Sequence, residues 1–161
     1  YPLRRQRQMC IRDRCNIMVH TLIISHGELC NGMMDTVKMV AGDDFNAKAL
    51  PLYPGVTSEE YREQLKKLVE EREDGSGTLI FTDLKGGTPY LSASYLAKNH
   101  KICVVTGMNL PLIFGILSEM RETTTLEEIS TMVKDPLYQG ITSVISGEGG
   151  KKREKLSIGK N

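Results

Sequence analysis

Short runs of β-branched and aliphatic residues alternate along the chain with longer segments in which apolar residues recur every three or four positions. The runs predict strands at residues 19–24, 47–52, 78–82 and 102–105. The intervening segments predict helices that begin near residues 29, 57, 88 and 110, followed by one over 126–133. Strands that alternate with helices in this way are typical of an α/β domain with a mainly parallel sheet.

Polar residues and glycines mark where these helices begin and end. We expect Gly42 to end the first helix and Asn109 to cap the fourth. Capping boxes are predicted at Thr57 with Glu60 and at Thr124 with Glu127, and an N-cap at Thr88, followed by Pro89. In the helix after Pro89, the residues expected to face the core are Tyr90, Leu91, Tyr95 and Leu96.

A proline sets the expected order of the strands. Pro51 lacks the N–H donor that a central strand needs, so the second strand is expected at a sheet edge. The first strand then lies beside it and the third on the other side of the first, which gives an open sheet of order 2-1-3-4 with helices on both faces. A late β-branched run, residues 141–145, favours a fifth strand that must find an edge to pair with.

Charge is unevenly divided along the 161 residues, although the formal net charge is only +1. Residues 1–17 hold five Arg and one Asp, residues 151–161 hold five basic residues and one Glu, and residues 18–150 hold 11 basic and 18 acidic residues, a net −7. The first 17 residues follow neither strand nor helix periodicity, and we expect a non-native or disordered leader, with a true basic arm as the alternative. We assign residues 18–147 to one domain and residues 148–161 to a disordered basic tail.

Composition argues against several classes of protein. An acidic body without Trp offers no broad basic surface for nucleic acid. The longest nearly continuous apolar run, residues 110–117, is far shorter than the ~20 residues that cross a membrane. The cysteines form no C-x-x-C pair, so we expect no disulfide framework and no zinc site, with Cys30 and Cys103 as buried free thiols.

Two polar segments follow the first and third strands, whose carboxyl ends flank the expected crevice of such a sheet. The first strand delivers His26, and the third delivers Asp83 followed by a Gly86-Gly87-Thr88 segment. A histidine and an aspartate are thus expected at one site. His20, inside the first strand, is expected to be a packed or hydrogen-bonded strand residue, and His100, in a polar loop, to be solvated.

The two glycines before a helix start predict an anion site, because small residues expose backbone amides and a helix N-terminus carries partial positive charge. An imidazole that donates one nitrogen to Asp83 keeps the other as a nucleophile, while the carboxylate stabilises the cation formed on attack at phosphorus. The set predicts a phosphohistidine relay without metal or other cofactor. The structural alternatives are that Asp83 caps a turn and that Gly86 and Gly87 form one.

Three segments of the sequence resemble, in order and spacing, the signature segments of one protein family. They are residues 23–29 (IISHGEL), 82–89 (TDLKGGTP) and 105–111 (VTGMNLP). The family is the IIA components of the mannose/fructose/sorbose/N-acetylgalactosamine branch of the bacterial phosphoenolpyruvate-dependent sugar phosphotransferase system. The resemblance runs from residue 18 to residue 145. One departure is Lys85, where the family usually carries an apolar or aromatic residue.

The resemblance implies a function and partners. His26 would accept phosphate from the carrier protein HPr and pass it to the cognate IIB component, and the membrane subunits IIC and IID would take part only indirectly. Asp83 would orient the imidazole, and the phosphoryl group would be bound by Gly27, Gly86, Gly87 and Thr88. The resemblance also implies a homodimer in which the fifth strand is exchanged and added antiparallel to the partner's sheet. Its expected location is the cytoplasm, with association with the membrane transporter complex as an alternative.

Other functions remain open at this point. The same fold and chemistry would suit a phosphoryl carrier that serves a dihydroxyacetone kinase, although Glu28 fits the sugar branch better. A module phosphorylated on His26 only for regulation is a second alternative. A receiver domain phosphorylated on aspartate is the weakest, because the acidic pair Asp43-Asp44 follows a helix and not the first strand.

Overall fold

The computed structural model describes residues 18–143, which form an α/β fold. Its strands are β1 (His20–His26), β2 (Lys48–Leu52), β3 (Thr78–Thr82) and β4 (Ile102–Thr106). Its helices are α2 (Leu29–Ala41), α3 (Ser58–Glu70), α4 (Thr88–Leu96), α5 (Leu110–Glu119), α6 (Leu126–Met132) and α7 (Pro136–Gln139). The four strands and five helices predicted from the pattern are present, and the short α7 is an addition.

The strands form one parallel sheet in the order β2-β1-β3-β4, which confirms the predicted order. β2 lies at an edge, and its Pro51 is in register with Ser25 of β1. An edge strand needs a hydrogen-bonding ladder on one side only, so the donor that proline lacks is tolerated there. β3 lies between β1 and β4, and all five of its residues are buried.

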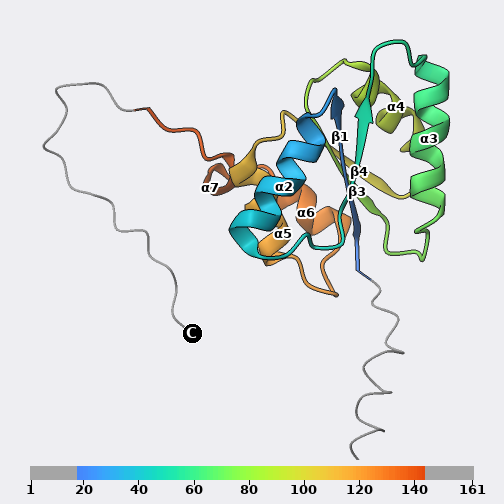
Figure 1. The fold of residues 1–161 in the computed structure, drawn as a ribbon. Helices are drawn as coiled ribbons and strands as arrows, with labels where there is room; N and C mark the ends of the chain where they lie inside the picture. Colours follow the sequence, from blue (N-terminus) through green and yellow to red (C-terminus); the bar gives the residue numbers. More distant parts are fainter. Residues whose placement is uncertain (1–17, 144–161) are drawn as a thin grey trace, which may run out of the picture.

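Helices cover both faces of the sheet, with α2, α5 and α6 on one side and α3 and α4 on the other (Figure 1). Successive strand residues point to opposite faces. Ile23 of β1 therefore packs in the core under α2 and α5, while its neighbours Leu22 and Ile24 pack in the core under α3 and α4. The strands are held from both sides, which fixes the positions of their carboxyl ends.

Most helix ends follow the predicted signals. Gly42 takes a left-handed conformation (φ 73°) after α2, and its N–H donates to the Lys38 carbonyl. Thr57 and Glu60 form a reciprocal capping box at α3. The Asn109 side chain accepts from the Leu112 N–H at 2.9 Å at the start of α5.

Two predicted helix caps are wrong by one residue. At α4 the N-cap is Gly87, not Thr88, which is the first helical residue. A Cβ at Gly87 would lie 2.5 Å from Cε1 of His26, so no side-chain cap fits there. At α6 the capping box is Thr125 with Glu128, not Thr124 with Glu127, because the Thr124 hydroxyl accepts the Arg121 N–H in the preceding turn.

The prediction for the buried face of α4 is also partly wrong. Leu91 and Tyr95 are 55% and 49% exposed. The buried residues of this helix are Pro89, Ser92, Ala93 and Leu96. Small residues on the inner face let α4 pack closely on α3 and the sheet, whereas the larger apolar residues are left outside.

The predicted fifth strand is not formed within the described part of the chain. Residues 141–143 follow α7 without strand conformation. The rest of that run, the leader 1–17 and the tail 148–161 lie outside the described residues, so strand exchange and the domain limits stay predictions. Within residues 18–143, no helix is both long and apolar enough to cross a membrane.

Cys30 and Cys103 are free thiols, but the predicted burial is confirmed in full only for Cys30. Cys30 is fully buried in the core under α2, and Cys103 on β4 is partly buried beside the same core. Among residues 18–143, no three His, Cys, Asp or Glu side chains gather into a set that could hold a metal ion.

Two glycine substitutions should change stability in opposite directions. Gly32 lies inside α2 with open space around the position of a Cβ, so Gly32→Ala should raise the free energy of unfolding by about 0.5–1 kcal/mol. Gly77 has φ +93°, and a Cβ there would meet Leu126 Cδ1 at 2.8 Å and the Lys101 carbonyl oxygen at 2.9 Å. Gly77→Ala should therefore lower the free energy of unfolding by about 1–3 kcal/mol. Urea denaturation of both variants measures the difference, and equal stabilities would contradict this packing.

Candidate functional site

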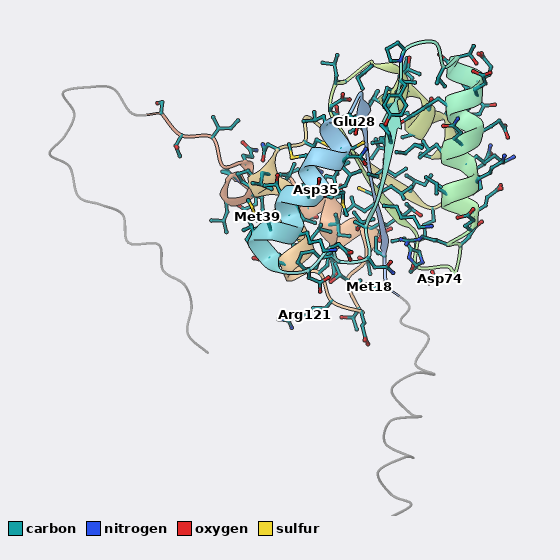
Figure 2. The ribbon with its side chains drawn as sticks, in the orientation of Figure 1. Met18, Glu28, Asp35, Met39, Asp74 and Arg121 are labelled. Carbon is teal, nitrogen blue, oxygen red and sulfur yellow. The ribbon has the colours of Figure 1, made fainter. Side chains whose placement is uncertain are left out.

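The candidate site lies where the carboxyl ends of β1 and β3 meet. His26 is the last residue of β1, and Asp83 directly follows β3. Figure 2 shows Glu28, two residues after His26, at this end of β1, whereas Met18 and Asp74 lie at the opposite end. The parallel pairing of β1 with β3 thus brings together two residues that are distant in sequence, as the topology led us to expect.

One carboxylate oxygen of Asp83 holds both the main chain and the ring of His26. Asp83 Oδ2 accepts the His26 backbone N–H at 2.8 Å and lies 2.9 Å from His26 Nδ1. An ionised carboxylate can only accept, so Nδ1 carries the proton in this contact. Nε2 of a neutral ring is then unprotonated and keeps its lone pair. The His26 side chain is 45% exposed, whereas that of Asp83 is 13% exposed.

Asp83 is itself fixed by neighbouring main chain. Its other oxygen, Oδ1, accepts the Leu84 N–H at 2.7 Å. The segment after β4 supports the same stretch, because Gly107 N–H donates to the Asp83 carbonyl and Met108 N–H to the Thr82 carbonyl. This supporting role of residues 107 and 108 was not predicted from the sequence.

Two opposed effects act on the pKa of Asp83. Burial acts to raise it, but hydrogen bonds from the His26 N–H, the His26 ring and the Leu84 N–H together outweigh burial and lower the pKa below its usual range. The carboxyl group is therefore ionised at neutral pH, as the hydrogen-bond geometry requires.

Ser25 shapes the turn that carries His26, a role that was not predicted from the sequence. Its side chain is fully buried, and Oγ accepts the Cys30 N–H at 2.8 Å while donating to the Gly27 carbonyl at 3.2 Å. These bonds tie the end of β1 to the start of α2. A small polar residue directly after a buried apolar run was the available signal.

Gly87 brings the start of α4 against the imidazole. A Cβ at Gly87 would lie 2.5 Å from Cε1 and 3.1 Å from Nε2 of His26, so only glycine permits this approach. The free edge of the ring therefore faces the first turn of α4. Helix N-termini carry partial positive charge and unpaired N–H groups, which suits an anion at this place.

The four residues predicted to bind an anion differ in what they offer. The Gly27 N–H donates to the Leu52 carbonyl at 2.8 Å, and the Gly87 N–H to the Leu84 carbonyl at 3.2 Å, so both are already used. Among the hydrogen bonds of residues 18–143, none uses the N–H of Gly86 or Thr88. These two amides and the Thr88 hydroxyl are the available donors.

A hydrogen-bonded group that was not predicted lies next to His26. The Tyr53 hydroxyl donates to the Glu28 carboxylate, which also accepts from Asn31. The bonds from Asn31 and Tyr53 lower the pKa of Glu28, so this carboxylate is ionised beside the site. It adds negative charge at the start of α2, in contrast to the first turn of α4, which carries no acidic residue.

The other two histidines lie away from the site. His20, at the opposite end of β1, contacts Asp74 at 3.0 Å, in line with the prediction of a hydrogen-bonded strand residue. His100 was expected to be solvated, and this is wrong. Its side chain is only 14% exposed, and its ring nitrogens face Glu70 and Glu73 at 4.0 and 3.8 Å. The loop that holds it packs against the end of α3, which a polar sequence does not reveal.

Comparison with known proteins gives one consistent family. The family model described as "PTS system fructose IIA component" matches residues 20–134. The chain is 32% identical over 130 residues to the sorbose-specific EIIA component of Klebsiella pneumoniae, covering 80% of this chain and 88% of that protein. It is 30% identical over 122 residues to the fructose-specific EIIA component of Bacillus subtilis (strain 168), covering 73% of this chain and 80% of that protein.

A solved structure agrees with these relatives. The crystal structure of the phosphotransferase system component EIIA from Streptococcus agalactiae superposes with a TM-score of 0.69 at 25% sequence identity. The similarity covers 78% of this chain and 97% of that one. The likeness therefore includes nearly the whole fold of that protein.

The pKa of Asp83 should depend on the His26 ring. In His26→Ala the ring hydrogen bond is lost while the backbone N–H remains, so we expect the pKa of Asp83 to rise toward or above its usual range. Because the pKa is depressed by folding, the stability that Asp83 contributes is present above its unfolded pKa and is lost as pH falls through the folded value. A carbon-13 NMR titration of the Asp83 carboxyl measures this pKa in the parent and in His26→Ala.

His20→Ala is the matched control for this titration, because His20 contacts Asp74 and not Asp83. It should leave the titration of Asp83 unchanged. An Asp83 pKa that is the same in His26→Ala as in the parent would show that the ring contact contributes nothing.

Proposed function

The chain belongs to the fructose- and mannose-type IIA family of the sugar phosphotransferase system, and from this premise we propose that it is a phosphohistidine carrier. His26 accepts a phosphoryl group from HPr and passes it to a histidine of the cognate IIB component. The proposal is supported most directly by one observation, the contact of Asp83 Oδ2 with Nδ1 of an exposed imidazole. This contact leaves Nε2 as the nucleophile.

The transfer step uses the two ring nitrogens differently. The lone pair of His26 Nε2 attacks phosphorus, the Nε2–P bond forms, and the bond from phosphorus to the donor's imidazole nitrogen breaks. The donor nitrogen keeps the electron pair of that bond. The His26 ring becomes more positive as the bond forms, and the Asp83 carboxylate, 2.9 Å from Nδ1, stabilises that charge. Transfer to IIB is the same displacement with the IIB histidine as nucleophile.

The phosphoryl oxygens need donors beside Nε2, and the start of α4 supplies them. The N–H groups of Gly86 and Thr88 and the Thr88 hydroxyl are available, and the partial positive charge of the helix N-terminus acts in the same direction. Gly87 contributes by having no side chain beside the ring, and Gly27 by the left-handed turn (φ 56°) that follows His26. Lys85 is exposed on the same turn and adds positive charge nearby.

The exposure of the site suits a protein donor. The imidazole is 45% exposed at the end of the sheet, so a histidine on the surface of another protein can reach Nε2. A dihydroxyacetone kinase subunit would require the same access. The identity of the acceptor therefore has to be tested with both proteins.

Phosphorylation by the donor chain tests the role of His26. With phosphoenolpyruvate, enzyme I and HPr, the parent should gain an acid-labile phosphate, and His26→Ala should gain none. Asp83→Asn keeps the shape but loses the charge, so its rate should fall by about 10²–10⁴-fold. The labelled protein should then transfer its phosphate to IIB and not to a kinase subunit.

A matched histidine variant controls for loss of fold. His20→Gln changes the same strand at its other end and should be labelled at the parental rate. Labelling of His26→Ala at the parental rate would overturn the assignment of His26. Full activity of Asp83→Asn would overturn the role of Asp83.

We also propose a homodimer formed through the outer edge of β4. β4 ends the sheet, and within the described residues no strand pairs with its outer edge. The chain leaves the fold at α7, which is anchored by the Asn109 side chain donating to the Gln139 carbonyl at 3.1 Å. Ile141, the next apolar residue, is 84% exposed. An open edge and an exposed β-branched residue at the start of the 141–145 run are complementary elements for strand exchange.

Removal of residues 141–161 tests the dimer while keeping α7 in place. Tyr138 packs on Gly115 and bonds to Glu119, so a chain that ends at Gly140 retains these contacts. Sedimentation should show a dimer for the full chain and a monomer for the truncated one. A truncated protein that sediments as a stable dimer would contradict strand exchange.

A further inference from the structure

The Glu28 carboxylate is fixed beside the candidate site by hydrogen bonds to both of its oxygens. Oε1 accepts the hydroxyl of Tyr53, which directly follows β2, and Oε2 accepts the Asn31 side chain of α2 at 2.7 Å. Glu28 and Tyr53 are both exposed, and holding an exposed glutamate in one position costs side-chain entropy. Two donors from separate segments therefore specify where this charge lies.

Capping of α2 does not account for this arrangement. Glu28 occupies the N-cap position of α2, yet within the described residues its side chain accepts from no N–H of the helix. The Cys30 N–H at this helix start is instead accepted by Ser25 Oγ at 2.8 Å. A carboxylate near a helix N-terminus is favourable through the helix dipole. The dipole thus explains the residue type but not the bond to Tyr53.

The bond between Tyr53 and Glu28 lies beside the turn that carries His26. The Gly27 N–H donates to the Leu52 carbonyl at 2.8 Å, so the main chain already joins this turn to the end of β2. Two Cα–Cα steps of about 3.8 Å each keep the Cα atoms of His26 and Glu28 within about 8 Å of one another. The side-chain bond therefore adds a fixed position for the carboxylate next to a turn that is already held.

A fixed negative charge at this place acts against a phosphoryl group. The bonds from Asn31 and Tyr53 lower the pKa of Glu28, so the carboxylate is ionised at neutral pH. Protonation of the His26 ring adds positive charge, which a nearby carboxylate favours, whereas phosphorylation adds negative charge, which it disfavours. The start of α4 acts on the phosphoryl group in the opposite direction. The site thus combines attraction from one helix start with repulsion from the other.

We propose that Tyr53 is a positioning residue that holds the Glu28 carboxylate beside His26, so that its charge weakens the hold of the site on the phosphoryl group. This inference rests on the proposed function and deepens it. A carrier must release the phosphoryl group to the acceptor as well as take it from the donor. A charge that cannot swing away from the arriving group keeps the Nε2–P bond easier to break.

The equilibrium of phosphoryl transfer from phosphorylated HPr measures this effect. Glu28→Gln keeps the shape and an acceptor oxygen but removes the charge, so the equilibrium constant for phosphorylation of His26 should rise by about 1.5–3-fold at low salt. The gain should vanish at about 1 M salt, where charges are screened within ~3 Å. Tyr53→Phe should shift the constant in the same direction by a smaller factor, because its carboxylate stays charged but is no longer held by the phenol.

An NMR titration of the unphosphorylated His26 ring separates a charge effect from a structural one. In Glu28→Gln the midpoint should move to lower pH while phosphorylation is strengthened, because the two reactions add opposite charge. Asp83, which contacts Nδ1, and Lys85, exposed on the turn before α4, are the other charges of this region and remain in every variant. A variant that merely disturbed the Asp83 contact would weaken both protonation and phosphorylation.

The contact itself has a spectroscopic readout. The bond to Glu28 raises the pKa of Tyr53, so the phenol should titrate at lower pH in Glu28→Gln than in the parent. A double variant then tests whether Tyr53 acts through Glu28. In the Glu28→Gln chain, Tyr53→Phe should have no further effect on the equilibrium constant, because no charge is left to position.

Two matched controls remove the same groups elsewhere. Glu122→Gln removes an exposed carboxylate next to Arg121, which Figure 2 shows at the end of the molecule opposite Glu28. Tyr138→Phe breaks a tyrosine–glutamate bond of the same kind, to Glu119, which joins α7 and α5. Both controls should leave the equilibrium constant and the His26 titration unchanged.

The outcomes separate this inference from the proposed function. A labelled parent with an equal or smaller equilibrium constant in Glu28→Gln would overturn the role of Glu28 alone. The parental constant in Tyr53→Phe, or a Tyr53→Phe effect that persists in the Glu28→Gln chain, would overturn positioning by Tyr53. No labelling of the parent by phosphorylated HPr would overturn the proposed function and this inference with it.

Discussion

The site depends on one carboxylate that is held in place from three directions. Asp83 accepts the main-chain N–H of His26, the ring of His26 and the N–H of Leu84, so its two oxygens fix both the end of β1 and the start of the following turn. Because β1 and β3 are paired in parallel and buried on both faces, neither end can move far from the other. The orientation of the imidazole is therefore a consequence of sheet packing. Of the three hydrogen bonds, only the one from Leu84 joins residues that are neighbours in sequence.

The close approach of Gly87 shows a conflict between helix capping and the site. A serine or threonine cap stabilises a helix start by about 1 kcal/mol, yet α4 has no side-chain cap. Any Cβ at that position would overlap the imidazole. The helix therefore begins without a side-chain cap beside the ring, and Pro89 fixes the direction of the first turn without needing an N–H of its own. The start of α4 thus lacks the stabilisation of a side-chain cap at the place where an anion is expected to supply the missing contacts.

The sequence predicted the elements and the strand order well because those depend on local patterns and on one edge residue, Pro51. It also brought His26 and Asp83 together, since parallel topology alone determines which strand ends meet. It failed where the outcome depends on contacts between distant parts. The Gly87 cap is set by the ring of His26, the burial of His100 by the end of α3, and the outward position of Leu91 by close packing of small residues. None of these contacts has a periodic signal.

The same close packing determines which side chains surround Tyr95. Ser92 and Ala93 let α4 sit near α3, and this proximity is what places Arg62 over Tyr95. A larger residue on the inner face would move the helices apart and separate the cation from the ring. The first turn of α4 thus carries partial positive charge. About 10 Å further along the helix, the Tyr95 ring contacts one cation from α3 and one from the segment after α4.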